Sequence, residues 1–186
     1  MKLATWIAAL ACLMPAAASA AEPGRAACEV AAATITDHLA TERGRVVVVV
    51  GVSPDAGPSK ADIARRRLSD WSKAAPSQPL LRAWSAAPRT DVLQCPAVQD
   101  LLARRGIASG QAAADPLRQG SGGKPLLSWR GEILAVGMPV VSADGQDALV
   151  EIGSACGGLC GAGFLLHLRR ANDAWAVAGS LWLWIS

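Results

Sequence analysis

The sequence is poor in the side chains that enzymes most often use for chemistry. It contains two histidines, one phenylalanine and no tyrosine, and it lacks the G-x-S-x-G segment that carries many hydrolase nucleophiles. We therefore favour a non-enzymatic role and name no catalytic residue and no cofactor. The formal net charge of +3 is too small for a nucleic-acid partner. Beyond residue 20 no segment is apolar for the ~20 residues that a membrane-spanning helix needs, so we expect no membrane span.

The first twenty residues are typical of a secretory signal peptide. Lys2 supplies a positive start, residues 3–14 form an apolar run, and residues 18–20 (Ala-Ser-Ala) form a small-residue cleavage site. Cleavage before Ala21 removes one lysine and no acid, which lowers the formal net charge from +3 to +2. Residues 21–186 then form one domain of a periplasmic or secreted protein.

Four cysteines remain after this cleavage, namely Cys28, Cys95, Cys156 and Cys160. An even number of cysteines in an exported chain predicts disulfides, and four cysteines allow three pairings. The simplest pairing joins Cys28 to Cys95 and Cys156 to Cys160. A loop of nearly seventy residues is worth roughly 4.4 kcal/mol in chain entropy, whereas a five-residue loop is worth only about 2 kcal/mol. The long bridge would therefore stabilise the fold, and the short one would fix a local shape.

The N-terminal half combines helices with one buried strand. Five consecutive valines predict a central strand over 45–52, because a β-branched run apolar on both faces is typical of such strands. Three consecutive arginines, residues 65–67, would point in different directions on a helix and indicate a solvated face. Three helices are predicted. The first spans 26–41, and the third runs from Pro96 to Gly106. The second begins after the N-cap Ser59 and ends at Pro76, with Ile63, Leu68 and Trp71 on its inner face.

Residues 108–124 are predicted to be a loop or linker. The segment reads ASGQAAADPLRQGSGGK, which is rich in glycine and small polar residues. A connection of this length is unusual inside one domain, so we expect it to be either mobile or functional.

The C-terminal third changes to strands and turns. An Asp-Gly pair within residues 143–146 predicts a hairpin turn. Four antiparallel strands in sequence make a β-meander. The predicted fold class is therefore α+β, with N-terminal helices packed on a curved antiparallel sheet that ends in a C-terminal meander. The predicted strands span 132–141, 147–155, 164–170 and 175–185.

The segment CGGLCGAG, residues 156–163, admits several interpretations. We favour a structural disulfide that fastens the connection between two adjacent strands. Backbone N–H groups of Gly157, Gly158 and Gly161 could also form an anion-binding concavity. The alternative is a thiol-redox or copper-handling site formed by Cys156, Cys160 and His167, although zinc would need a fourth ligand.

Both histidines have simple structural interpretations. His167 alternates with an apolar set, which predicts a partly exposed histidine on the other side of its strand. His38 is expected to pair with Glu42 at helical spacing. Ser154, His167 and Asp147 are the residue types of a hydrolase catalytic triad, but their spacing in the sequence matches no known hydrolase motif.

Two tryptophans in the terminal LWLWIS are the best candidates for a binding surface. Strict alternation places Leu181, Leu183 and Ile185 on one face and Trp182 with Trp184 on the other. Adjacent exposed tryptophans indicate a partner or ligand surface. The alternative is that helices and the long loop cover this face of the sheet as well.

The last fifty residues resemble a loose set of small, uncharacterised exported bacterial proteins. The resemblance lies in residues 142–150, the GGLCGAG segment, Trp175-Ala176-Val177 and the LWLWIS terminus. It implies a C-terminal hairpin and carries no catalytic residue. Together these features predict an exported, disulfide-stabilised envelope protein that binds a small ligand or an envelope protein. The thiol-redox or copper-handling protein is the alternative.

Overall fold

The computed structural model describes residues 23–41, 46–52, 58–119, 131–156 and 160–185. The predicted signal peptide lies outside these residues. Within them, no helix combines the length and apolar character needed to cross a membrane. The helices are α1 (Pro23–Thr41), α2 (Lys60–Ala64), α3 (Gln78–Ala86), α4 (Pro96–Arg105) and α5 (Gln111–Gln119), with short 3-10 turns at Leu68–Asp70 and Val92–Gln94.

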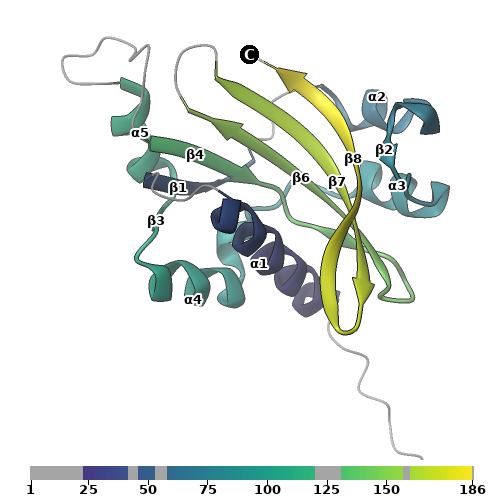
Figure 1. The fold of residues 1–186 in the computed structure, drawn as a ribbon, viewed down its shortest axis with the longest axis horizontal. Helices are drawn as coiled ribbons and strands as arrows, with labels where there is room; N and C mark the ends of the chain where they lie inside the picture. The colour runs from purple at the N-terminus through teal and green to yellow at the C-terminus, as the bar shows by residue number, and fades with distance from the viewer. Residues whose placement is uncertain (1–22, 42–45, 53–57, 120–130, 157–159, 186) are drawn as a thin grey trace, which may run out of the picture.

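The strands form one mixed sheet, and the α+β prediction is confirmed (Figure 1). Strands β6, β7 and β8 pair antiparallel in the predicted C-terminal meander, and β4 pairs antiparallel with β6. Strand β1 lies between β3 and β4 and is parallel to both. The order across the sheet is β2-β8-β7-β6-β4-β1-β3, with β5 paired to β6. The strands are β1 (Val46–Gly51), β2 (Ser72–Lys73), β3 (Ala108–Ser109), β4 (Gly131–Val136), β5 (Val140–Val141), β6 (Asp147–Ala155), β7 (Gly161–Ala171) and β8 (Ala174–Ile185).

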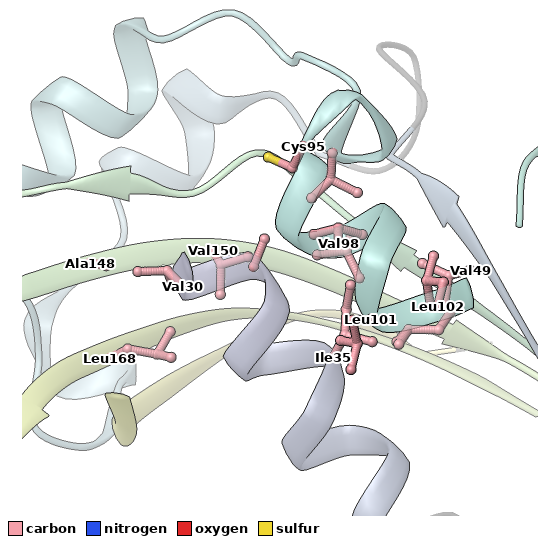
Figure 2. Close-up of a cluster of buried hydrophobic side chains, with 14 of the residues drawn as sticks. Val30, Ile35, Val49, Cys95, Val98, Leu101, Leu102, Ala148, Val150 and Leu168 are labelled. Atoms are coloured by element: carbon pink, nitrogen blue, oxygen red, sulfur yellow. The ribbon is translucent and has the colours of Figure 1, made fainter. Parts of the chain in front are cut away.

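Helices cover both faces of the sheet because β1 is apolar on both faces. Val47 and Val49 belong to the largest core cluster, which packs against α1 and α4 (Figure 2). Val48 and Val50 face the other way and pack against Ala114 of α5. A third cluster on the α5 face joins α3 to β6, β7 and β8. It is built from Leu81, Trp84, Leu149, Leu165, Leu181 and their neighbours.

Several helix boundaries lie where capping residues in the sequence predicted them. The Ser59 side chain accepts a hydrogen bond from the Asp62 N–H and caps α2, as expected for an N-cap serine. Pro96 opens α4, and Gly106 ends it with a φ of 62° in the left-handed region. The Cys28–Cys95 pair, with Cα atoms 5.4 Å apart, ties α1 to the start of α4.

The second predicted helix is much shorter than expected. It ends at Ala64 instead of continuing to Pro76, and a 3-10 turn follows at Leu68–Asp70. The Asp70 carboxylate accepts a hydrogen bond from the Arg67 N–H, which offers the backbone an alternative to a continued helix. Trp71 is buried in the third cluster, so tertiary packing supports this bend.

Two further predictions needed correction. The strand predicted over 132–141 is interrupted between β4 and β5, where Gly137 pairs with Asp91 and Pro139 cannot donate a hydrogen bond. The predicted loop at 108–124 contains β3 and the helix α5 up to Gln119, with Pro116 inside that helix. Complete burial of Ala114 against the sheet explains why a helix forms in spite of the proline.

Candidate functional site

A polar cavity lies at the carboxyl end of β1. The connection from β1 to β3 first runs through α2, β2 and α3, whose helices pack on the α5 face, and then through α4 on the other face. The connection from β3 to β4 runs through α5. In open sheets, ligands commonly bind beyond the carboxyl ends of parallel strands. This strand-end pocket has a volume of about 590 Å³. It is lined by Gly51, Val52, Arg89, Asp91, Leu93, Gly110, Gln111 and Arg118.

The polar side chains of the strand-end pocket come from two segments, the α3–α4 connection and the helix α5. Asp91 lies between α3 and α4, and its Oδ1 atom accepts a hydrogen bond of 2.9 Å from the Leu93 N–H. Gly51 ends β1, and a Cβ atom at this position would come within 2.6 Å of the same Oδ1 atom. Glycine at residue 51 therefore allows Asp91 to approach the end of the strand. Gln111 and Arg118 come from α5.

The arginines of the pocket are balanced by carboxylates. The Arg89 guanidinium donates to both Glu151 oxygens at 3.3 Å, and these side chains are only 13% and 8% exposed. Arg118 donates to Gln111 Oε1 at 2.7 Å and to Asp115 Oδ1 at 3.1 Å. The positive charges are therefore largely neutralised within the protein.

Lys60 lies beside the Arg89–Glu151 pair. Its ammonium donates to the carbonyl oxygens of Trp84 and Ala87, at 3.0 and 2.8 Å. Burial lowers the pKa of Lys60 below its ordinary value, the Glu151 carboxylate opposes this shift, and Arg89 adds to it. This lysine acts as a structural donor that ties α2 to the end of α3.

A second, mostly apolar cavity lies beside the strand-end pocket, and we call it the apolar limb. This limb has a volume of about 180 Å³ and shares Gly51, Gln111 and Arg118 with the pocket. Trp184 lines this cavity, and its indole lies over Gly153 and Gly163. The floor of the limb includes Val50, Ile133, Ala135 and Ala155.

The prediction that Trp182 and Trp184 share a face is wrong. Gly163 pairs with Trp184 and Phe164 pairs with Trp182, so β8 contains one extra residue at Leu183. Such a bulge interrupts the alternation of side chains. Trp184 lies on the face of the third core cluster, whereas Trp182 packs on Phe164, with ring centroids 4.3 Å apart, on the α1 face.

The cysteine loop fits a disulfide better than a metal site. Cys156 and Cys160 are paired, with Cα atoms 5.2 Å apart. Gly157 and Gly158 lie outside the described residues, and Gly161 begins β7. His167 lies six residues farther along β7, or roughly 20 Å away at the rise of a strand. Among the residues that the structure describes, no group of three or more histidine, cysteine or acidic side chains is placed to hold a metal.

His167 is buried, which corrects the prediction of partial exposure. Its side chain is 1% exposed, with Nε2 at 2.8 Å from Asp147 Oδ1 and Nδ1 at 3.1 Å from the Ala74 carbonyl oxygen. Arg169 also donates to Asp147 Oδ1. The ring thus joins β6 and β7 to the segment after β2. Both ring nitrogens therefore have a hydrogen-bond partner inside the protein, Asp147 and the Ala74 carbonyl, which explains why a histidine occupies this buried position.

The hypothetical hydrolase set does not assemble. Asp147 and His167 are in contact, but the Ser154 hydroxyl donates to Glu132 at 2.5 Å on the opposite face of the sheet. The same carboxylate lies 2.7 Å from Nε2 of His38. The predicted partner of His38, Glu42, lies outside the described residues.

Sequence reasoning missed Arg89, Asp91, Gln111 and Arg118 as site residues. The one available signal was the length of the 108–124 segment, which includes Gln111 and Arg118. The fold and the pocket define an α+β domain with a polar cavity at the ends of its parallel strands. Comparisons of the chain with protein-family models, curated proteins and solved structures give no match.

Proposed function

We propose that the protein is an exported, disulfide-stabilised binding module whose strand-end pocket and apolar limb hold a neutral, hydroxyl-rich ring ligand of the sugar class. The observation that carries this proposal is that a polar pocket with balanced charges shares three lining residues with an apolar limb lined by Trp184. Both cavities share Gln111 and Arg118, so one ligand can contact both.

The balance of charge favours a neutral ligand. Arg89 and Arg118 each have a carboxylate partner, and Asp91 adds a further negative charge to the pocket. A strongly anionic ligand would compete with these internal pairs. Hydroxyl groups both donate and accept hydrogen bonds, which matches a pocket that offers a guanidinium, an amide and a carboxylate together.

The apolar limb favours a ring. An indole presents a wide apolar surface and a single N–H donor, so it suits ligands with one apolar and one polar side. Sugar rings have such a form, with C–H groups on a face and hydroxyls around the edge. Pockets that combine an apolar wall with a few convergent polar groups are the usual form of small-molecule sites.

Export is part of the proposal and has its own support. The A-x-A site at residues 18–20 and the two cysteine pairs fit an oxidising compartment. N-terminal sequencing of the protein recovered from the periplasm or medium should begin at Ala21. Recovery of the intact N-terminus from the cytosol would contradict this part of the proposal.

Ligand binding is tested by saturation-transfer NMR with a panel of mono- and disaccharides, followed by calorimetry on the sugars that respond. Trp184→Phe and Gln111→Ala should each weaken binding about tenfold, which corresponds to ~1.4 kcal/mol. Trp182→Phe is the matched control, because that tryptophan lies on the opposite face and should leave the affinity unchanged. Absence of any sugar response, or equal losses in the two tryptophan variants, would overturn the proposed ligand class.

A further inference from the structure

A second cavity lies on the opposite face of the sheet, between α1 and the strands β6, β7 and β8. It has a volume of about 340 Å³. One wall is a polar stripe of α1, since residues three and four apart share a helix face. This stripe carries Thr34, Asp37, His38 and Thr41. The facing wall is apolar and carries Ile152, Leu166, Leu168, Trp175 and Val177. We call this cavity the α1 cleft.

Most polar groups of the α1 cleft already have partners inside the protein. The Thr34 hydroxyl donates to the Val30 carbonyl, and the Thr41 hydroxyl donates to the carbonyl of His38. The ring of His38 is paired with Glu132, as described above. Asp37 differs, because within the described part of the chain its carboxylate has neither a hydrogen-bond donor nor an ion-pair partner.

The apolar wall continues onto the outer strand of the meander. Among the described residues the exposed large hydrophobic side chains are Val177, Trp182 and Ile185, which are 41%, 49% and 74% exposed, and all three belong to β8. Val177 lines the α1 cleft itself. Trp182 packs on Phe164 on the same face. Helix α1 contacts β6 and β8 on this face of the sheet (Figure 1). These side chains add exposed apolar surface on the face of the sheet that the α1 cleft occupies.

We propose that the α1 cleft binds a small cationic amphiphile, with its alkyl chain along the β7–β8 wall and its ammonium group against Asp37. The volume lies at the lower end of the range for small-molecule sites, which fits a single chain. Charge complementarity favours a cationic head group. Asp37 is the unpaired acid of the lining, and among the described residues no lysine or arginine lines the cleft. This site is separate from the strand-end pocket, so neither proposal depends on the other.

The test compares three probes that share one chain, namely n-octylamine, 1-octanol and octanoate. Calorimetry measures the affinity of each probe. Amide chemical-shift changes in α1 and β8 show that the probe binds in the α1 cleft. The amine should bind best and octanoate worst. In Asp37→Asn the preference for the amine over the alcohol should fall about threefold, the size expected for one exposed ion pair. Shortening the amine to hexylamine should weaken binding severalfold per methylene lost.

Two variants make the outcome decisive. Glu29→Gln removes another exposed acid of α1 that is paired with Arg25 and lies outside the lining, so the amine preference should persist. Val177→Asp places a charge on the partly exposed apolar wall and should weaken binding of 1-octanol without unfolding the protein. The proposal is overturned if no probe binds, if the three heads bind equally, or if Asp37→Asn and Glu29→Gln give the same preference. Trp184→Phe should leave amine binding unchanged.

Discussion

The indole of Trp184 lies over Gly163 of the neighbouring strand, in the space that a Cβ atom at residue 163 would occupy. Gly153, paired with Gly163 across the sheet, lies under the same ring, where a Cβ would be 3.1 Å from Cζ2. Two paired glycines therefore make room for the indole of Trp184, which lines the apolar limb.

Substitution of Gly163 should destabilise the protein. In Gly163→Ala the new methyl group must displace the indole, and we expect a loss of about 1–3 kcal/mol in the free energy of unfolding, as for other overpacked sites. Urea denaturation measures the loss. Gly24→Ala is the control, since a Cβ there meets nothing within 4 Å, and stability should not fall. A Gly163→Ala protein as stable as the control would show that Trp184 is not held over Gly163.

The two cysteine pairs should contribute unequally to stability. The Cys28→Ala/Cys95→Ala double variant opens a loop with a sequence separation of 67 and should lose about 4 kcal/mol. Opening Cys156–Cys160, with a separation of 4, should cost about 2 kcal/mol. Denaturant midpoints of the two double variants give the comparison. Equal losses would contradict the assignment of the long bridge as the main covalent support.

Removal of the Arg89 side chain should be costly for a different reason. Arg89→Met leaves the Glu151 carboxylate, 8% exposed, without its guanidinium partner, and breaking such a buried pair costs on the order of 3 kcal/mol. Arg118→Met is the matched control, because the Arg118–Asp115 pair is 42% and 53% exposed and should be worth less than about 1 kcal/mol. Thermal or urea unfolding distinguishes the two. Similar small losses would mean that water solvates Glu151 in the variant.

The turn between β5 and β6 should show a measurable shift in acid. The Ser142 hydroxyl, together with the Gln146 N–H, holds the pKa of Asp144 below its ordinary value of 3.8. A carboxyl group with a lowered folded-state pKa stabilises the fold above pH 3.8, and this contribution is lost as the pH falls through the folded-state pKa.

NMR titration of the Asp144 side chain tests this relationship directly. In Ser142→Ala the pKa of Asp144 should rise toward its ordinary value. Ser85→Ala, which removes a hydroxyl that donates to the Arg82 carbonyl away from this turn, should leave it unchanged. Identical titration curves for Asp144 in the native protein and in Ser142→Ala would refute the role of the hydroxyl.

The sequence by itself determined the fold class and most of the elements, and of the three possible cysteine pairings it favoured the one that the structure shows. Two pairs of cysteines and the α+β class with its C-terminal meander were all predicted correctly. The reason is that these features are local. Apolar periodicity, a capping serine, a helix-opening proline and a Cys-Cys spacing act over a few residues, so they can be recognised without knowing what packs against them.

Only the tertiary structure decided which side chains meet. The bulge at Leu183 moved Trp184 away from Trp182, and strand pairing placed His167 against Ala74, 93 residues away in sequence. Burial of Ala114 turned a predicted loop into the helix that carries Gln111 and Arg118. Contacts between distant segments depend on register and on the crossing of the chain from one face of the sheet to the other. Neither leaves a periodic pattern in the amino-acid sequence, because a shift of one residue reverses the face on which every later side chain lies.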